Sequence, residues 1–305
     1  MCRIQTRFGF QSTAEEVVRG IELGGKRVLI TGGASGIGTE TIRALASVGA
    51  EVIMAVRRVN AGEKVAAEIG AATGNPNVTV RHLDLADQAS VKAFVAGWSG
   101  PLDILINNAG IMALPALERT PEGWEMQFAT NFLGHFTLTV GLHRALSAAN
   151  GARIVSVSSS GHMISPVVFD DPHFNFLPYD PFIAYGQSKT ADVLLAVEAT
   201  RRWADDGIFA NALNPGAIVT NLQKHTGGLK TPPERRKTPG QGAATSVLLA
   251  ASPLLAGIGG RYFEDGNEAQ TVARRPTDFS GGVAPYALDS DNAHRLWEVS
   301  LRLVS

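Results

Sequence analysis

Short apolar runs alternate with segments of helical periodicity along most of this chain. Runs rich in β-branched residues, each about as long as a buried strand, begin near residues 28, 52, 78, 102, 154, 208 and 260. Residues 39–48 represent the segments between them, with Ile42, Leu45 and Ala46 on one helical face. Strands that alternate with helices in this way indicate an α/β fold, a parallel sheet with helices on both faces.

A glycine-rich segment follows the first apolar run. Residues 31–38 read Thr-Gly-Gly-Ala-Ser-Gly-Ile-Gly and join a predicted strand to a predicted helix, which is the setting of a dinucleotide fingerprint. Gly32 permits a tight turn, Gly36 leaves the backbone open to a pyrophosphate, and Gly38 lets the helix approach the strand. The helix N-terminus offers its N–H groups to the anion. The spacing differs from Gly-x-Gly-x-x-Gly, so a plain tight turn is the alternative.

Tyr185 and Lys189 stand four residues apart in the segment Tyr-Gly-Gln-Ser-Lys. On a helix this spacing places both side chains on one face. An ammonium beside a phenol favours phenolate and lowers the tyrosine pKa from about 10 toward neutrality. Such a phenol can exchange a proton with an alcohol or carbonyl oxygen. Alone, the pair is equally compatible with an ordinary helix surface.

Together with several further motifs, the glycine loop and the Tyr-Lys pair resemble the short-chain dehydrogenase/reductase family. The further motifs are Asn107-Asn108-Ala109-Gly110, Asn131 in a helix, the run 154–159 that ends at Ser159, and the segment 214–220 with Pro215, Gly216 and Thr220. The resemblance covers about residues 24–263 and implies a Rossmann-type, doubly wound sheet of about seven strands in the order 3-2-1-4-5-6-7. Residues 8–21 and 295–300 are similar to the retinol-dehydrogenase-like and WW-domain-oxidoreductase-like branch.

The resemblance also implies a role for each matching residue. Its catalytic set is Asn131, Ser159, Tyr185 and Lys189. Its cofactor-binding residues are Gly32, Ser35, Gly36, Ile37, Gly38, Asp84, Leu85, Asn108, Ala109, Gly110, Tyr185, Lys189, Pro215, Gly216 and Thr220. Ser159 steadies the carbonyl oxygen, Tyr185 supplies the proton, and Lys189 also holds the nicotinamide ribose. Asn131 keeps a water near Lys189.

The second apolar run bears on the choice of cofactor. An enzyme that prefers NAD usually carries an acidic residue near the end of this strand. Here Glu51 lies at the wrong end, and Arg57 and Arg58 follow the run. A guanidinium at this place can bind a 2′-phosphate, so we expect NADP rather than NAD, with Arg57 as the main contact. A solvated turn is the alternative for the arginines, and a helix N-cap is the alternative for Asp84.

The domain organisation follows from the same pattern. We read residues 1–24 as an N-terminal arm packed on a single dinucleotide-binding catalytic domain, residues 25–305, with substrate loops at about 161–184 and 221–240. The first loop is longer than is common in the family and holds several aromatic residues, namely Phe169, Phe174, Phe176, Tyr179 and Phe182. These rings either line an apolar cleft or pin the loop to the body, and we favour the second for most of them. The second loop is rich in proline, and we expect a mobile lid.

Composition excludes several functional classes. The 305 residues carry 27 Lys and Arg against 28 Asp and Glu, so we expect no nucleic-acid partner. Cys2 is the only cysteine, which excludes an internal disulfide and fits a cytoplasmic location. No apolar run is long enough for a membrane span. The histidines show no metal-ligand spacing, so we expect no metal, and we read His135 as structural. A Gly-x-Ser-x-Gly elbow is absent, which disfavours a serine hydrolase.

These features lead to one main functional hypothesis and two alternatives. We expect an NADP(H)-dependent oxidoreductase that interconverts a carbonyl and an alcohol on an apolar small molecule. One alternative is an NADP(H)-binding redox-sensing or scaffold protein with little turnover, and another is an epimerase or dehydratase on the same fold. By analogy with the family, we expect a homodimer or homotetramer. Its interface would use residues 133–140 or 193–197, which are equally compatible with the core.

Overall fold

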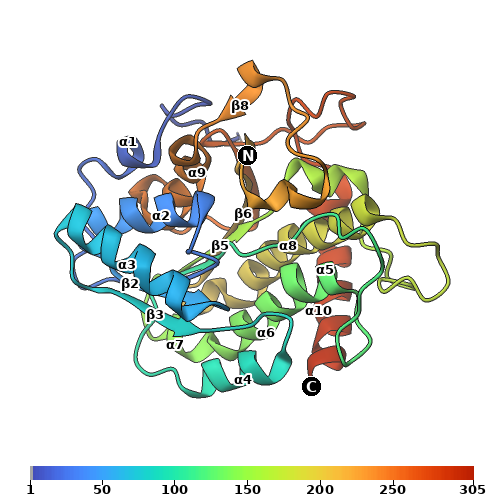
Figure 1. Cartoon of the computed structure of the whole chain (residues 1–305), viewed down its shortest axis with the longest axis horizontal. Coiled ribbons are helices and arrows are strands. Elements are labelled where there is room, and N and C mark those ends of the chain that lie inside the picture. Colours follow the sequence, from blue (N-terminus) through green and yellow to red (C-terminus); the bar gives the residue numbers. More distant parts are fainter. Residues whose placement is uncertain (1–2) are drawn as a thin grey trace.

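The computed structural model describes residues 3–305, so Cys2 lies outside the described residues. Within this range the main sheet has eight strands, in the order β10-β9-β6-β5-β4-β1-β2-β3. Figure 1 shows strands of this sheet surrounded by helices. The strands are β1 (Arg27–Thr31), β2 (Glu51–Val56), β3 (Val78–His82), β4 (Ile104–Asn107), β5 (Arg153–Val157), β6 (Phe209–Asn214), β9 (Arg261–Glu264) and β10 (Asn267–Glu268). All neighbours pair in parallel except β10, which pairs antiparallel with β9. The predicted doubly wound sheet and its strand order are confirmed; the short β10 was not predicted.

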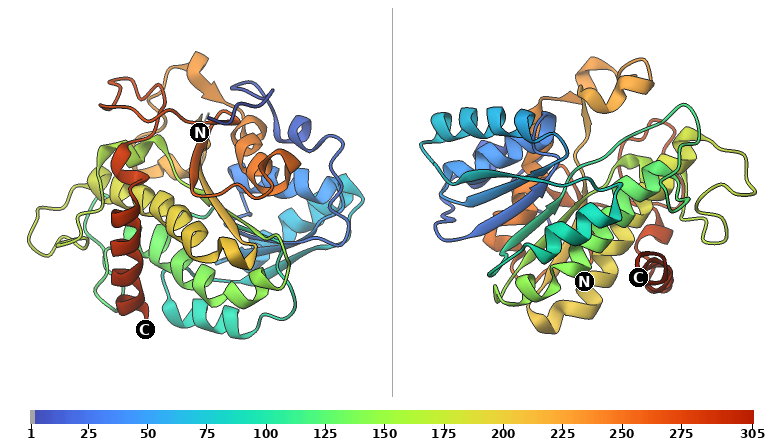
Figure 2. Two further views of the ribbon diagram at one scale, coloured as in Figure 1. Left: turned by 180° about the vertical axis from the view of Figure 1, so that it is seen from behind. Right: turned by 60° about the horizontal axis from the view of Figure 1, so that its bottom comes forward.

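Helices cover both faces of this sheet (Figure 2). One apolar core lies between the sheet and α1 (Ala14–Val18), α2 (Gly36–Ser47), α3 (Val59–Thr73) and α9 (Pro239–Ala251). The other lies under α4 (Gln88–Ala96), α5 (Met126–Phe128), α6 (Gly134–Gly141), α7 (His143–Ser147), α8 (Pro181–Trp203) and α10 (Ser290–Val304). Because both faces are covered, the central strands are continuous apolar runs, as in Val28, Leu29 and Ile30, which are all fully buried.

The chain segments of the site follow the carboxyl ends of four strands. The glycine loop follows β1, Asn108 follows β4, Ser158 and Ser159 follow β5, and Pro215 follows β6. These four strands are adjacent in the sheet and parallel, so their carboxyl ends lie at one edge. In an open α/β sheet this edge is where ligands bind.

Residues 3–24 lie against the α9 side of the molecule. Thr13 caps α1 with a reciprocal bond to Glu16, and Val17 and Val18 of this helix are buried in the core that α9 also lines. Further toward the N-terminus, backbone N–H groups donate to side chains near β10: Ile4 to Glu268 at 2.9 Å, and Thr6 to Asn267 at 2.7 Å. The segment is therefore attached at two places far apart in the sequence.

The C-terminal helix α10 lies on α8 and α6, at the face where we expected subunits to meet. The Trp297 ring packs edge-on against Phe136 of α6 and against Trp203 of α8. The distances between ring centroids are 5.0 Å and 5.1 Å, respectively. Most of the apolar residues considered for an interface are fully buried in the single chain: Leu133, Phe136, Leu138, Val193 and Leu194. These side chains form core rather than an exposed subunit surface.

Membrane-spanning helices and metal-ligand clusters are both absent from residues 3–305. No helix in this range combines the length and the apolarity that a bilayer crossing requires. No three or more His, Cys, Asp or Glu side chains in this range are grouped as metal ligands would be.

Candidate active site

The glycine loop is shaped by close contacts that only glycine allows. Gly32 has φ +72°, and a Cβ there would lie 2.8 Å from the Cα of Ala109. A Cβ on Gly38 would lie 2.6 Å from the carbonyl oxygen of Gly32. The Ser35 side chain at the start of α2 accepts no bond from the first turn, so the N–H groups of this turn remain available to an anion. This shape fits the predicted role of the loop as a cradle for a phosphate group, and the loop is called the nucleotide cradle below.

The segment after β4 is bonded directly to this loop. The N–H groups of Asn108 and Ala109 both donate to the Thr31 hydroxyl at 3.0 Å. The Asn108 side-chain amide donates to the Thr31 carbonyl at 2.8 Å. Gly110, next in the chain, lies beside Lys189: a Cβ there would stand 3.7 Å from the ammonium. The segment thus connects the nucleotide cradle to the residues of α8.

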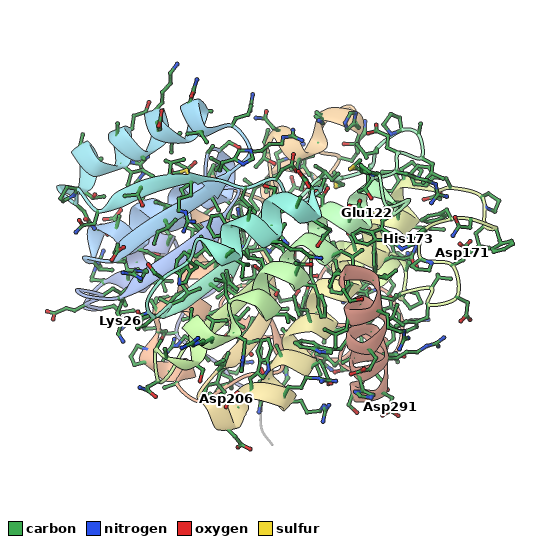
Figure 3. All side chains as sticks on the ribbon, turned by 90° about the horizontal axis from the view of Figure 1, so that it is seen from below. Lys26, Glu122, Asp171, His173, Asp206 and Asp291 are labelled. Atoms are coloured by element: carbon green, nitrogen blue, oxygen red, sulfur yellow. The ribbon has the colours of Figure 1, made fainter. Side chains whose placement is uncertain are left out.

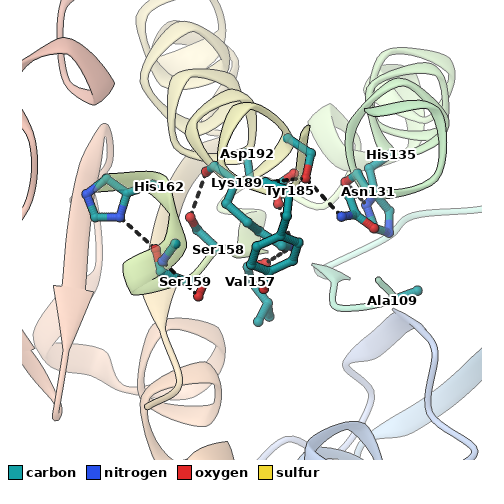
Figure 4. Close-up of polar contacts among 12 residues, drawn as sticks. Ala109, Asn131, His135, Val157, Ser158, Ser159, His162, Tyr185, Lys189 and Asp192 are labelled. Atoms are coloured by element: carbon teal, nitrogen blue, oxygen red, sulfur yellow. Dashed lines mark hydrogen bonds and ion pairs between the residues drawn. The ribbon is translucent and has the colours of Figure 1, made fainter. Parts of the chain in front are cut away.

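Tyr185 and Lys189 lie on α8, as the spacing predicted, and both are almost fully buried (Figure 4). The helix begins at Pro181 because the Asp180 carboxylate caps the N–H groups of its first turn. The Lys189 ammonium stands 5.8 Å from the centre of the Tyr185 ring. It donates to the Val157 carbonyl at 3.0 Å and to the Asp192 carboxylate at 2.8 Å. The phenol and the ammonium therefore share one buried site at the end of β5.

The Lys189–Asp192 pair has unusual titration behaviour. Burial opposes the charge on Lys189, but the carboxylate of Asp192 outweighs it, and the pKa of Lys189 is raised. Burial likewise raises the pKa of Asp192 to about 7, although the neighbouring ammonium lowers it. The Lys189 ammonium keeps its proton because its Nζ lies 2.8 Å from the carboxylate of Asp192.

Ser159 lies next to the Tyr185 ring, with Gly161 between them. The Ser159 hydroxyl accepts a bond from the Gly161 N–H at 3.0 Å and so keeps its own proton to donate. A Cβ on Gly161 would come within 2.7 Å of the Tyr185 ring and 3.4 Å of the Ser159 hydroxyl. The preceding Ser158 is fully buried and donates to the Lys189 carbonyl at 2.7 Å. Of the two serines, only Ser159 has a hydroxyl available to a substrate.

Asn131 lies in a π-helical turn, η1 (Ala129–Leu133), which widens the helix before α6. Its side-chain oxygen accepts from the Ile111 N–H at 2.8 Å. Its amide donates to the Ile111 carbonyl and to the Ser188 hydroxyl, both at 2.9 Å. The side chain thus joins the segment after β4 to the turn of α8 that holds Lys189. The water expected near Lys189 stays a prediction.

His135 completes a second connection, from η1 to the nucleotide cradle. Its Nδ1 lies 2.7 Å from the Asn131 carbonyl and its Nε2 lies 2.8 Å from the Thr31 hydroxyl. Because a carbonyl only accepts, Nδ1 carries the proton, and Thr31 donates to Nε2. Burial lowers the pKa of His135 to about 3, so the ring is neutral. The residue that we read as structural therefore connects Asn131 to the glycine loop.

Three further residues predicted to bind the cofactor, Arg57, Asp84 and Leu85, follow the ends of β2 and β3, beyond the glycine loop. The Gly32 N–H donates to the Ala55 carbonyl, and the exposed Arg57 stands two residues further along the same strand end. Asp84 accepts from the Ala86 N–H at 3.0 Å, whereas Asp87 caps α4. Asp84 is therefore not the N-cap of the next helix. Leu85 is buried against Gly134 of α6.

The segment after β6 lies over the glycine loop. The Thr220 methyl group would stand 3.2 Å from a Cβ on Gly36. Gly216 has φ +91° and packs against Lys237. Ile37 at the start of α2 lies near Gly242 of α9. The proline-rich segment that follows holds two 3-10 turns, η4 (Asn221–His225) and η5 (Pro233–Arg235), and the strand β8 (Arg236–Lys237), which pairs with β7 (Ala217–Ile218). Its mobility stays a prediction.

The long segment before Tyr185 holds five aromatic residues, of which three attach it to the body and the last, Phe182, already lies in α8. Phe174 packs edge-on against Tyr179, whose hydroxyl donates to the Leu114 carbonyl at 3.0 Å. Phe169 lies under the Arg295 guanidinium of α10. Phe176 is 91% exposed and Phe182 47% exposed.

The same segment also contains Asp171 and His173, which are labelled in Figure 3. The Asp171 carboxylate accepts hydrogen bonds from three backbone N–H groups, those of Asn175, Phe176 and Leu177.

Four residues at the site were missed by sequence reasoning: Asp192, Gly161, Thr31 and His162. Asp192 had a detectable signal, an opposite charge three residues after Lys189 on the predicted helix. Gly161 and Thr31 had none, because their roles depend on segments far apart in the sequence. His162 is also buried next to Ser159, with Nδ1 at 2.6 Å from the Ser159 carbonyl.

Known proteins share both the sequence and this arrangement. The profile of the family described as short chain dehydrogenase matches residues 26–228. A protein of Streptomyces antibioticus described as a "probable oxidoreductase" is 56% identical over 292 residues, 91% of this chain and 97% of that protein. Human retinol dehydrogenase 13 is 38% identical over 293 residues, 92% of this chain and 85% of the relative. The chain therefore belongs to the short-chain dehydrogenase/reductase family, in its retinol-dehydrogenase-like branch.

Solved structures agree with this membership. An uncharacterised protein from Mycobacterium paratuberculosis has a TM-score of 0.74 and 34% identity, over 96% of this chain and 97% of that one. A gluconate 5-dehydrogenase from Burkholderia cenocepacia, in complex with NADP and tartrate, has a TM-score of 0.63 and 26% identity. That match covers 83% of this chain and 97% of the other.

Proposed function

We propose that this protein is an NADP(H)-dependent oxidoreductase that interconverts a carbonyl and an alcohol on an apolar small molecule. The observation that carries the proposal is the grouping of the buried Tyr185 and Lys189 with the partly exposed Ser159, at the edge of the sheet that also bears the glycine loop. Membership of an oxidoreductase family agrees with it.

The residues present fit a nicotinamide dinucleotide. Gly32 and Gly38 leave room that a Cβ would fill, and the first turn of α2 has uncapped N–H groups for the phosphates. Arg57 supplies a positive charge at the strand end where a 2′-phosphate would bind. The gluconate 5-dehydrogenase structure contains NADP, which supports the same choice here. When bound, the cofactor supplies or accepts the hydride.

The side chains of this protein then stabilise the charge on the substrate oxygen and transfer the proton. The Ser159 hydroxyl donates a hydrogen bond to the substrate oxygen, where negative charge grows during reduction. The Tyr185 hydroxyl gives its proton to the same oxygen, and the Lys189 ammonium stabilises the phenolate that remains. In the direction of alcohol oxidation, the phenolate accepts the proton instead. Asn131 fixes the position of Ser188, one residue before Lys189.

An apolar substrate is supported by exposed apolar side chains that neighbour site residues along the chain. Ile183 and Phe182, just before Tyr185 on α8, and Val219, next to Thr220, are all exposed. Exposed large apolar residues around a functional site often contact a ligand.

Tyr185→Phe tests the proposed function. We expect the rate of NADPH oxidation with a reducible ketone or aldehyde to fall about 10²- to 10⁴-fold, because the variant lacks the transferable proton. The rate is followed at 340 nm across a panel of apolar carbonyl compounds.

Calorimetric titration with NADP⁺ is the control, and its affinity should stay within about threefold of the wild type. Wild-type turnover in the variant would contradict the role of Tyr185. Cofactor binding without activity on any compound in the wild type would favour the redox-sensing alternative.

A further inference from the structure

A buried carboxylate lies next to the catalytic ammonium and has no part in the mechanism so far. Asp192 follows Lys189 by three residues on α8, and its Oδ2 lies 2.8 Å from the Lys189 Nζ (Figure 4). The two side chains are 4% and 6% exposed, respectively. An ion pair so completely removed from water is costly unless its geometry is good, and breaking it by removing one partner is strongly unfavourable. We therefore ask what the buried carboxylate contributes to the function of Lys189.

The hydrogen bonds of Lys189 define where its ammonium sits. An ammonium has three N–H donors. Within residues 3–305, one donates to the Val157 carbonyl at 3.0 Å and one to Asp192. The strand end and the carboxylate thus hold Nζ from two sides and leave one N–H for a ligand or solvent. A four-carbon side chain that would otherwise rotate freely is fixed below the Tyr185 ring.

The charges around the pair are few. From α8 itself, Tyr185 acts on Lys189. From α6, His135 is neutral, because burial and, to a lesser extent, the charge of Lys189 lower its pKa to about 3. From η2 (Ser160–Ile164), His162 is also neutral, because burial lowers its pKa to about 4. From β9, Tyr262 is buried with a raised pKa and stays protonated. Among the described residues, Lys189 is the only group whose charge acts on Asp192.

We propose that Asp192 is a positioning residue that acts through Lys189, holding its ammonium in place and keeping it protonated while Tyr185 exchanges its proton. This inference rests on the proposed function of Tyr185 and Lys189. Without the carboxylate, a fully buried ammonium has no counter-ion and tends to lose its proton near neutral pH. The phenolate of Tyr185 then lacks the positive charge that stabilises it.

Asp192→Asn tests this role with an almost isosteric change. We expect kcat for carbonyl reduction at neutral pH to fall about 10- to 100-fold, in line with the loss of one stabilising charge. The alkaline limb of the kcat profile should move to lower pH by at least about one unit, because Lys189 then loses its proton earlier. Activity should accordingly recover as the pH is lowered. A profile unchanged from the wild type, or an alkaline limb moved to higher pH, would overturn the proposal.

A double-mutant cycle separates action through Lys189 from an independent effect. In the background Lys189→Met, removing the Asp192 carboxylate should change kcat by less than about twofold, because the partner is already absent. If Asp192→Asn reduces kcat equally in both backgrounds, Asp192 does not act through Lys189.

The same cycle gives a readout that needs neither cofactor nor activity. Each single variant leaves a buried ionisable group without its partner, which is unfavourable whether that group stays charged or is neutralised, so each should melt below the wild type. The double variant has neither charge and should melt above both singles. Additive losses in melting temperature would overturn the pairing itself, even if the oxidoreductase activity is real. Coupled losses with no activity on any carbonyl compound would keep the pairing and reject the proposed function.

Glu198→Gln is the matched control. Glu198 lies two turns further along α8, is also fully buried, and accepts from the guanidinium groups of Arg201 and Arg202. The substitution removes a buried carboxylate from the same helix without contact to Lys189. It should lower the melting temperature and leave the pH profile unchanged. The same displacement of the profile in this variant would mean that a general weakening of α8, rather than Asp192, controls the pH dependence.

Discussion

At the scale of single residues, His135 has contacts in the structure that its position in the sequence does not predict. From sequence, a histidine four residues after Asn131 is an ordinary helix position. In the structure its two ring nitrogens connect the Asn131 carbonyl to the Thr31 hydroxyl, which in turn accepts the N–H groups of Asn108 and Ala109. Each group in this chain of bonds has the one donor or acceptor role that its partner needs. The arrangement holds only while the ring is neutral.

The pH dependence of stability follows from this arrangement. The folded pKa of His135, about 3, lies well below the unfolded value of 6.5. Its contribution is therefore fully present above about pH 6.5 and is lost as the pH falls, because only the unfolded chain then binds the proton. We expect His135→Asn to cost about 1–3 kcal/mol near pH 8. That difference from the wild type should shrink by up to about 1.4 kcal/mol per pH unit below pH 6.5.

Urea denaturation of both proteins at several pH values measures this difference. A constant gap between about pH 8 and pH 5 would contradict the neutral buried ring.

Arg57 carries the prediction about the cofactor. A guanidinium can bind a 2′-phosphate through two charge-assisted hydrogen bonds, each stronger than a neutral one. We expect the wild type to bind NADP⁺ at least about tenfold more tightly than NAD⁺. Arg57→Ala should remove most of this preference by weakening NADP⁺ binding and should leave NAD⁺ binding nearly unchanged.

Calorimetric titrations of both nucleotides decide the matter, with Arg58→Ala as the neighbouring control that should keep the preference. Equal affinities in the wild type would reject NADP selectivity, and an equal effect of both arginine variants would reject Arg57 as the main contact.

At the scale of elements, α8 carries Tyr185 close to its N-terminal end. The spacing of Tyr185 and Lys189 predicted a helix here. The start of the helix was not evident, because the aromatic and proline residues before Tyr185 do not show helical periodicity. The structure begins the helix at Pro181, with two bonds of 2.8 Å from the Phe182 and Ile183 N–H groups to the Asp180 carboxylate. Proline at the first helical position needs no N–H partner. Tyr185 therefore lies only one turn from a capped end.

Asp180→Ala should loosen this turn. Loss of an N-cap costs about 1 kcal/mol of stability, and the fraying reaches Tyr185, so we expect kcat to fall as well. Asp87→Ala removes the equivalent cap of α4, where Asp87 accepts from the Ala89 N–H at 2.9 Å. It should cost a similar amount of stability with little change in kcat.

Chemical denaturation and steady-state kinetics of both variants test the comparison. An equal fall in kcat in the two variants would mean that global stability, not the α8 end, limits the rate.

At the scale of the whole molecule, α10 closes one of the two apolar cores. Trp297 contacts an aromatic ring on each of α6 and α8, and the Arg202 guanidinium lies 4.9 Å over its ring. The same helix faces were candidates for a subunit interface. Because α10 lies on them in the single chain, an oligomer would have to use another surface or displace this helix.

Trp297→Ala should therefore have a large effect. Truncating a buried tryptophan costs about 3–5 kcal/mol, and the exposed faces of α6 and α8 should then promote self-association. Denaturation measures the first effect and light scattering the second. Leu254, which is 58% exposed, is the control: Leu254→Ala should change stability by less than about 0.5 kcal/mol. A loss of similar size in both variants would show that α10 does not close the core.

Much of the fold and some of the site were accessible from the sequence for a common physical reason. The alternation of strands and helices, the glycine loop and the Tyr-Lys spacing are local patterns, and local geometry alone fixes what they mean. The motif order of the family added Ser159 and Asn131. The short antiparallel β10 carried no such pattern, since two residues contain no periodicity.

The sequence by itself determined the class of the sheet and which helix face carries the phenol and the amine. Only the tertiary structure decided that Asp192 is buried against that amine, that Thr31 and His135 meet across a separation of 104 residues, and that α10 covers the helices we had considered for subunit contacts. These outcomes depend on which distant segments exclude water from one another. A hydrogen bond or ion pair gains its strength from that exclusion, and no spacing along the chain encodes it directly.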